Sequence, residues 1–276
     1  MDSHPSTPKV IPMTLIPLNA PNDSQLYVSQ IIDNLPDLAF YFGADTETIV
    51  NYAQRHFKAP HRQWEWLTVR AMLRHALGPS ARIEYLPSGK PQLSFKFQDS
   101  SFRVQDSGTK QDSDLNPVRD RQTLNFKLST LNFISLSHSK THAALLLSAS
   151  PHVGVDIETV SPRILRLASR IAQPCELPAS FAALSDEDKA RHLTILWTLK
   201  EATYKSLDDQ SGVDLLKDIT VAPTFTSADD IWFTANVTFS PRAGISQLFN
   251  ATFSMLDAEC SMVNVLSVVQ RPAAET

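Results

Sequence analysis

The stretch GVDIE, residues 154–158, predicts a β-strand over residues 152–158. Alternate side chains of a strand project from the same face, so Asp156 and Glu158 share one face and the two aliphatic residues share the other. Two neighbouring carboxylates repel each other unless positive charge lies between them. Mg²⁺ suits such a pair, because it takes a few carboxylate oxygens and keeps several waters. An exposed strand edge with solvated acids is the alternative interpretation.

Further strands are predicted on both sides of this stretch by runs of alternating, β-branched or aromatic residues. They cover residues 10–16, 82–86, 93–97, 131–136 and 142–148 before it, and 218–222, 230–238, 246–255 and 261–270 after it. Helices are expected at residues 24–34, 45–57, 61–77, 161–172 and 185–207. Candidate N-caps are Asp45, Thr46, Ser161 and Ser185, and Gly78-Pro79 is a C-terminal stop.

The order of these elements, helices and strands followed again by helices and strands, predicts an α+β protein. A length of 276 residues allows about two structural units. We expect an N-terminal half at residues 10–150 and a C-terminal half at residues 151–270. Residues 98–123 are dominated by Ser, Asp, Gln, Lys and Arg, and are interpreted as a mobile surface insertion in the first half.

The composition excludes several classes of protein. The seven glycines are scattered, with no two within ten residues, which excludes a P-loop and a dinucleotide-binding fingerprint. A formal net charge of −4 gives no footprint for general nucleic-acid binding. No apolar run reaches ~18 residues, so no membrane-spanning helix is expected. Cys175 and Cys260 lack zinc-type spacing and are interpreted as buried thiols. We therefore expect a soluble, cytoplasmic protein.

A second motif, WTLKEATYK, covers residues 197–205 in the longest predicted helix. Trp197, Glu201 and Lys205 are four residues apart and share one helical face, with Lys200 one residue round. Taken alone, the motif is best explained as a surface ion pair between Glu201 and Lys205, worth ~0.2–0.5 kcal/mol, beside a core tryptophan.

Two shorter stretches supply groups that can contact an anion. Ser137 and His138 end a strand in the sequence SLSHS, and Lys90 lies in the turn SGKPQL. A serine hydrolase is rejected, because the G-x-S-x-G elbow is absent and adjacent strand residues point apart. Zinc at His138 and His142 is disfavoured, because a spacing of four does not converge on a strand. On its own, Lys90 is interpreted as a solvated lysine.

The helix over residues 61–77 carries Arg62, Arg70 and Arg74 near one face. Positions eight and four apart lie close together on a helix surface. An arginine-rich face of this kind suits a phosphate group, because guanidinium groups donate paired hydrogen bonds to phosphate oxygens.

The four motifs together, GKPxL, LSHS, GVDIE and WxxKEAxxK, resemble in this order the Sfp-type 4′-phosphopantetheinyl transferases over about residues 60–215. The last two motifs are the specific ones. The resemblance implies a pseudo-twofold pair of α/β halves with the active site in the cleft between them. It implies that the arm of coenzyme A is transferred to a serine of an acyl or peptidyl carrier protein, releasing adenosine 3′,5′-bisphosphate. Mg²⁺, or Mn²⁺ in its place, is the implied cofactor.

The resemblance also implies roles for individual residues. Asp156, Glu158 and Glu201 match the metal ligands, and Glu201 matches a residue that serves as the base or orients it. Lys205 matches the lysine that contacts the phosphates and protonates the leaving group.

The residues that match contacts to coenzyme A lie in the other motifs. Lys90, Ser137 and His138 match groups at its phosphates. Arg70 matches an arginine at the 3′-phosphate, and Arg62 is a weaker match.

The chain departs from the family in the long segment between GKPQL and LSHS, and in keeping only Gly212 of a turn after Lys205. Two other functions stay open: a Mg²⁺-dependent phosphohydrolase of nucleotides or coenzyme A, and a catalytically silent protein that binds coenzyme A or a carrier. The intact carboxylates and Lys205 argue against silence. The carrier is left open among fatty acid, polyketide, non-ribosomal peptide and polyunsaturated fatty acid synthases, and the family's length implies a monomer.

Overall fold

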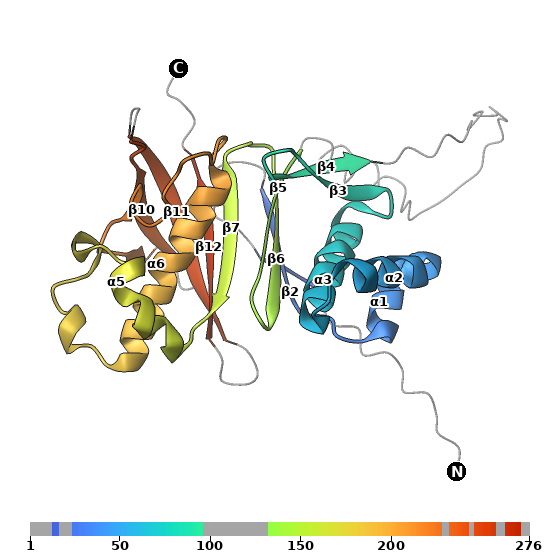
Figure 1. Ribbon diagram of the computed structural model, residues 1–276, viewed down its shortest axis with the longest axis horizontal. Helices are drawn as coiled ribbons and strands as arrows, with labels where there is room; N and C mark the ends of the chain where they lie inside the picture. Colours follow the sequence, from blue (N-terminus) through green and yellow to red (C-terminus); the bar gives the residue numbers. More distant parts are fainter. Residues whose placement is uncertain are drawn as a thin grey trace, which may run out of the picture.

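The computed structural model describes residues 13–16, 24–95, 132–227, 232–242, 246–257 and 263–271. It has the mixed helix and sheet composition that the sequence predicts, with two main antiparallel sheets and helices packed against them (Figure 1). The expected insertion at residues 98–123, the start of the first expected strand and Cys260 lie outside the described residues. No helix within the described ranges is both long and apolar enough to span a bilayer.

The first sheet has the strand order β1-β2-β6-β5. Its strands are β1 (Thr14–Ile16), β2 (Gln25–Gln30), β5 (Phe133–His138) and β6 (His142–Ser148). Helix α3 (Pro60–Leu77) packs on it, with α1 (Leu35–Phe42), a 3-10 turn η1 (Gly43–Asp45) and α2 (Thr46–His56) against that helix. All seven residues of β6 are buried, because a sheet neighbour lies on each side and helix α3 lies over one face.

The second sheet has the order β7-β12-β11-β10-β8, with β9 paired to β10. Its strands are β7 (Val153–Thr159), β8 (Ile219–Val221), β9 (Thr226–Ser227), β10 (Phe233–Phe239), β11 (Gln247–Asp257) and β12 (Val263–Gln270). Helix α6 (Asp186–Ser206) packs along β7 and β12. The remaining elements are the hairpin β3 (Ala81–Tyr85) and β4 (Pro91–Phe95), α5 (Ala168–Ile171), and the turns η2 (Pro162–Leu167), η3 (Pro174–Glu176) and η4 (Phe181–Ala183).

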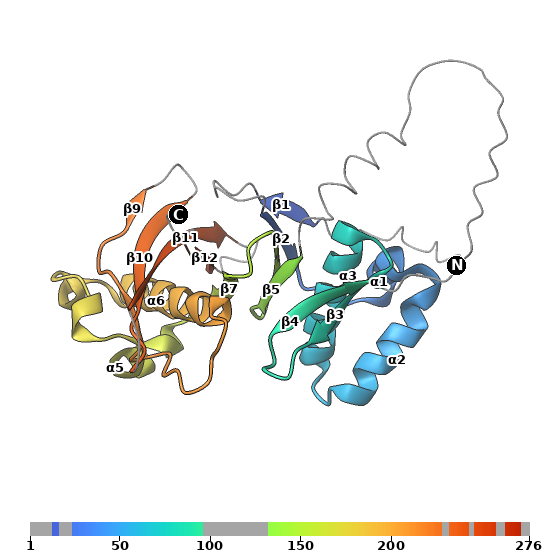
Figure 2. The ribbon, with the colours of Figure 1, turned by 90° about the horizontal axis from the view of Figure 1, so that it is seen from above.

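Strand β7 meets β5 and β6 where the two sheets adjoin, and two views at right angles show them together in the middle of the molecule (Figures 1 and 2). Val155 and Ile157 of β7 are fully buried in a core that Leu26 and Ala144 of the first sheet share. The motif GVDIE therefore lies at the junction of the two sheets.

Gly154 allows helix α6 to approach β7 closely. A Cβ atom at this position would lie 1.8 Å from the carbonyl oxygen of Ala202 and 2.8 Å from its carbonyl carbon. Backbone atoms cannot yield to such an overlap, so a side chain here would push the helix off the strand. The glycine thereby fixes the distance between the two elements that carry the most specific motifs.

Most predicted elements are confirmed, within a few residues at their ends. The helix cap at Ser185 is confirmed, since its side chain accepts a hydrogen bond from the Asp188 amide. Gly78 ends α3 with φ of 84°, in the left-handed region that favours glycine. Asp45 precedes α2 as expected, but its carboxylate pairs with Arg74 instead of capping the helix.

The helix predicted at residues 24–34 is wrong. Residues 25–30 form strand β2 between β1 and β6, with Leu26 and Val28 buried on its inner side. Helix α1 begins only after Asn34, whose side chain accepts a hydrogen bond from the Asp37 amide. The alternation of apolar and polar residues in this segment has the period of a strand, and pairing with two neighbours satisfies its backbone.

Two smaller expectations are also corrected. Residues 162–171 form a 3-10 helix followed by one short α-helix instead of a continuous helix, although Ser161 caps it as predicted. Cys175 is an exposed free thiol, not a buried one. It lies in the 3-10 turn η3, where the neighbouring Glu176 points inward to a buried ion pair and Cys175 faces outward.

Candidate active site

An open cavity of about 1460 Å³ lies between the two sheets. Helices α2 and α3, the β3–β4 hairpin, and strand β5 line it from one side, and β7 and α6 line it from the other. All eight residues that the sequence motifs single out are in its lining: Arg70, Lys90, Ser137, His138, Asp156, Glu158, Glu201 and Lys205. Segments more than a hundred residues apart in the sequence thus contribute to one site.

Asp156 and Lys205 form the central ion pair of this cavity. The ammonium Nζ of Lys205 lies 2.6 Å from Oδ1 of Asp156, and donates a second hydrogen bond of 3.3 Å to the Val155 carbonyl. The Ser137 hydroxyl donates to the same Oδ1 at 2.7 Å. The other oxygen, Oδ2, is buried and has no hydrogen-bond partner among the residues that the structure describes. Within the described residues, the ion pair of Lys205 therefore joins α6 to β7, whereas the surface pair with Glu201 is not formed.

The neighbouring carboxyl groups have unusual acidities. Burial, followed by repulsion from Asp156, raises the pKa of Glu158 to about 7. Burial and the same repulsion also raise the pKa of Glu201. Lys205 opposes both shifts, but one ammonium does not offset three carboxylates. This end of the cavity consequently has an excess of negative charge.

A closed metal site is not already assembled from these side chains. No three His, Cys, Asp or Glu side chains among the described residues stand close enough together to hold an ion. The expected pairing of Asp156 with Glu158 on one face of β7 is nevertheless found, since both line the cavity with Glu201. His138 and His142 do not converge either: His142 is buried on β6 beside Thr141.

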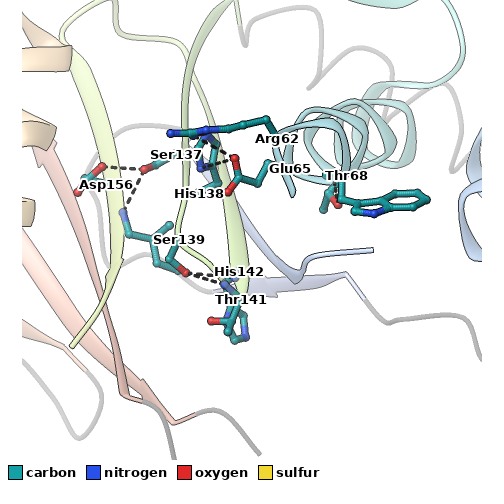
Figure 3. Close-up of polar contacts among 11 residues, drawn as sticks. Arg62, Glu65, Thr68, Ser137, His138, Ser139, Thr141, His142 and Asp156 are labelled. Atoms are coloured by element: carbon teal, nitrogen blue, oxygen red, sulfur yellow. Dashed lines mark hydrogen bonds and ion pairs between the residues drawn. The ribbon is translucent and has the colours of Figure 1, made fainter. Parts of the chain in front are cut away.

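Adjacent residues of β5 serve opposite walls of the cavity. Figure 3 shows Ser137 pointing toward Asp156 of β7, and His138 pointing toward Glu65 of α3. Nδ1 of His138 lies 3.5 Å from Oε2 of Glu65, and the same Oε2 accepts a hydrogen bond of 3.0 Å from Arg62. Glu65 was not predicted from the sequence, where only its spacing of three from Arg62 hints at the pair.

Lys90 bridges the hairpin to the second half of the chain. Its Nζ donates hydrogen bonds to the carbonyl oxygens of Pro151, at 3.3 Å, and Leu207, at 3.2 Å. Burial lowers its pKa. Gly89, with φ of 84°, makes the turn that brings the lysine to this position. Lys90 is therefore half-buried and held, and its interpretation as a solvated lysine is wrong.

The arginines of α3 have different environments. The Arg70 guanidinium stacks on the Trp66 ring, with its central carbon 3.6 Å from the ring centroid, and donates to the Trp66 carbonyl at 3.3 Å. Burial lowers its pKa, and no described carboxylate lies within 4 Å of it. Arg74 is paired with Asp45 at 2.6 Å. Arg70 is thus a half-buried cation in the cavity wall without a carboxylate partner in the described part of the chain.

Lys200 of the second motif is not in the cavity lining. It is fully buried on the opposite side of α6, where its Nζ lies 2.8 Å from Oε2 of Glu176. The other oxygen of Glu176 accepts from the Val221 amide at 2.8 Å. The pair links α6 to the η3 turn and to β8, and leaves Glu201 and Lys205 to face the cavity.

Comparisons with known proteins show which sequences this chain is similar to. Residues 152–249 match the family model described as the 4′-phosphopantetheinyl transferase superfamily. The chain is similar to the 4′-phosphopantetheinyl transferase AcpT from Escherichia coli, with 28% identity over 173 residues, 62% of this chain and 69% of the relative. It is also similar to the 4′-phosphopantetheinyl transferase HetI from Nostoc sp., with 26% identity over 201 residues, 70% of this chain and 69% of the relative.

The family model spans β7 and α6, the two elements that carry Asp156, Glu158, Glu201 and Lys205, and both relatives extend the similarity beyond it. Over residues 152–249 the chain is therefore similar to the 4′-phosphopantetheinyl transferase superfamily, and the two relatives extend that similarity over 62% and 70% of the chain.

Proposed function

We propose that this enzyme transfers the 4′-phosphopantetheine arm of coenzyme A to a serine of an apo acyl or peptidyl carrier protein, and releases adenosine 3′,5′-bisphosphate. The observation that carries the proposal is the convergence of Asp156, Glu158, Glu201 and Lys205, from β7 and α6, on one wall of a cavity whose opposite wall is cationic. Its volume of about 1460 Å³ is large enough for a cofactor-sized ligand.

Mg²⁺ fits the carboxylate end of the cavity. Among the described residues, the buried Oδ2 of Asp156 has no hydrogen-bond partner. Burial first, and repulsion from Asp156 second, raise the pKa values of Glu158 and Glu201, and a divalent cation would relieve that repulsion. A closed protein cage is not needed, because Mg²⁺ keeps several waters and takes few carboxylates. We propose that Asp156, Glu158 and Glu201 hold it, with Mn²⁺ as a substitute. When bound, it would offset charge on the oxygens of the diphosphate.

The cationic wall is proposed to hold the phosphates of coenzyme A. Arg70 is half-buried and has no carboxylate partner among the described residues, so a 3′-phosphate would supply the missing anion. His138 of β5 also lines the cavity, close enough to both Arg62 and Lys205 for their charges to act on it. Lys90, now on two carbonyl oxygens, would exchange one of them for a phosphate oxygen. Ser137 reaches Asp156 directly, so we assign it to supporting that carboxylate as well as to the substrate.

In the proposed reaction, the carrier serine oxygen forms a bond to the phosphorus that bears the pantetheine arm. The bond between that phosphorus and the bridging oxygen of the diphosphate breaks. The serine proton passes to Glu201, directly or through a water. The Lys205 ammonium offsets charge on the departing bisphosphate and gives it a proton. Both groups then return to their starting states by exchange with solvent.

We also propose that residues 10–150 and 151–270 are the two halves of a pseudo-twofold pair. Support comes from their composition: each described half has one main antiparallel sheet and one long helix against it, α3 on the first and α6 on the second. The cavity between them then has a cationic wall from one half and a carboxylate wall from the other. A single chain supplies both walls, so we propose that it acts as a monomer.

Product analysis tests the proposal against hydrolysis of coenzyme A. The enzyme is incubated with coenzyme A and Mg²⁺, with and without a panel of apo carrier proteins, and adenosine 3′,5′-bisphosphate is quantified by chromatography. We expect the bisphosphate to be released only when a carrier protein is present, in an amount equal to the amount of carrier protein modified. Release at the same rate without any carrier would support a phosphohydrolase and overturn the proposal.

A further inference from the structure

A buried carboxylate lies in the wall that the proposed function assigns to phosphate groups. Glu65 of α3 is 7% exposed and lines the same cavity as Lys90, His138 and Lys205. A negative charge here opposes the approach of a substrate rich in phosphates. The transfer reaction outlined above does not use it. The contacts of Glu65 explain why a carboxylate lies in this wall.

Those contacts join two candidate phosphate-binding side chains. Oε2 of Glu65 accepts a hydrogen bond of 3.0 Å from NH1 of Arg62 and lies 3.5 Å from Nδ1 of His138 (Figure 3). NH1 of Arg62 is also 3.4 Å from Nε2 of His138. The three side chains form a closed triangle across α3 and β5, and Glu65 is its buried corner.

The triangle also selects the hydrogen positions of the imidazole. A guanidinium group has only donors, so Nε2 of His138 must accept from Arg62. The hydrogen of the neutral ring then lies on Nδ1, the nitrogen that faces Glu65. Both contacts of Arg62 use NH1, so its other nitrogens remain to donate to a ligand.

We propose that Glu65 is a positioning residue, which holds Arg62 and His138 in the orientation that binds the phosphate groups of coenzyme A. This inference rests on the proposed function. The Arg62 side chain is 54% exposed and would otherwise sample many rotamers. Fixing it before the substrate arrives removes that entropy cost from binding. Glu65 touches neither the reacting phosphorus nor the leaving group in this scheme, so its effect falls on substrate affinity and not on turnover at saturation.

Glu65→Gln separates positioning from charge, because the two predict opposite signs. If Glu65 acted only by repelling phosphate groups, removing its negative charge would make coenzyme A bind more tightly. Glutamine keeps one amide oxygen, but its hydrogen bonds to Arg62 and His138 are weaker than those of a carboxylate, so both side chains are held less firmly and coenzyme A binding weakens. We expect the dissociation constant for coenzyme A, measured by calorimetry, and the KM to rise roughly tenfold, with kcat at saturation within about twofold of the parent. Glu47→Gln, an exposed residue of α2 outside the lining, is the matched charge control and should change neither.

The coupling of the three residues gives a second readout. In an Arg62→Ala, His138→Ala background, Glu65→Gln should have no further effect on coenzyme A affinity, because the two side chains that Glu65 positions have been removed. Glu65→Asp keeps the charge but retracts the carboxylate, and should weaken binding in the same direction by a smaller factor. It also serves as the test variant if Glu65→Gln fails to fold.

Imidazole ¹⁵N spectra of the ligand-free protein test the geometry without the reaction. We expect His138 in the tautomer with hydrogen on Nδ1, and a mixture of tautomers in Glu65→Gln. Unchanged or tighter coenzyme A binding in folded Glu65→Gln, or an unchanged His138 spectrum, would overturn the positioning role. A parent protein that does not bind coenzyme A would instead overturn the proposed function.

Discussion

Lys205 on helix α6 and Asp156 on strand β7 are joined by a contact of 2.6 Å between Nζ and Oδ1. The two residues belong to different sequence motifs, 49 positions apart, and Gly154 sets the distance between their elements. Ser137 donates to the same oxygen, so two donors hold Oδ1, while Oδ2 has no hydrogen-bond partner in the described part of the chain. The protein thus orients Oδ1 of Asp156, and Oδ2 is the oxygen that we propose binds the cation.

Lys205→Ala should lower kcat by roughly a hundredfold or more, the scale of a lost proton donor. Lys205→Arg keeps the charge but is effectively never deprotonated, so it should recover only part of the rate. The control is Lys217→Ala, which removes an exposed lysine with a 75% exposed side chain. Steady-state rates and melting temperatures of the three variants check this. Near-normal turnover in Lys205→Ala would contradict its catalytic role.

Ser137→Ala should weaken the response to Mg²⁺ more than the response to coenzyme A. The substitution removes one of the two donors that orient Oδ1 of Asp156. We expect the Mg²⁺ concentration for half-maximal rate to rise roughly tenfold, the typical effect of removing a hydrogen bond that orients a metal ligand. Titration of the rate with Mg²⁺ at saturating coenzyme A, and the reverse titration, separate the two effects. A rise confined to the KM for coenzyme A would assign Ser137 to the substrate alone.

Gly154→Ala should destabilise the protein strongly, by about 3 kcal/mol or enough to prevent folding. The added Cβ would overlap the Ala202 carbonyl, and neither element can move without opening the core between them. Gly212→Ala is the control, since that glycine has open space around it and bears only the strain of a φ of 72°. Urea unfolding of both variants tests the difference. Equal stability for the two would show that α6 can shift away from β7.

Lys200→Met should cost about 3–5 kcal/mol, the typical result of leaving one member of a buried ion pair alone. The remaining Glu176 carboxylate is fully buried and still bonded to the Val221 amide. Lys217→Met, in an exposed pair with Asp214, should have little effect on stability. Thermal unfolding of both variants checks this. If the Lys200→Met protein folds, its kcat/KM is measured as well. A Lys200→Met protein of unchanged stability that lost activity would place Lys200 in the chemistry instead.

The elements that the sequence predicts well are those with strong local signals. Helix α3 begins at a proline and ends at a left-handed glycine, and strand β6 is a continuous buried run. The segment over residues 25–30 was mispredicted because it is short, and its pairing with two distant strands decides its structure. The exposure of Cys175 follows from the buried partner of its neighbour Glu176, which no local pattern reveals.

The candidate site divides in the same way. The eight motif residues could be proposed from the sequence, and all of them line one cavity. Their partners could not be predicted. Glu65 is recognised as a site residue only from its contact with His138, and the position of Lys90 is explained only by its hydrogen bonds to the carbonyls of Pro151 and Leu207. These contacts join segments 61 to 117 residues apart, where spacing along the chain carries no information about distance.

The intact mass of an apo carrier protein, after incubation with enzyme, coenzyme A and Mg²⁺, tests the central claim most directly. We predict that at least one carrier in a panel of acyl and peptidyl types gains the mass of one phosphopantetheine group. Three controls should show no gain: excess EDTA, the Asp156→Ala enzyme, and a carrier whose acceptor serine is replaced by alanine. Unmodified carriers throughout, in the presence of a folded enzyme that binds coenzyme A, or full modification in excess EDTA, would contradict the account.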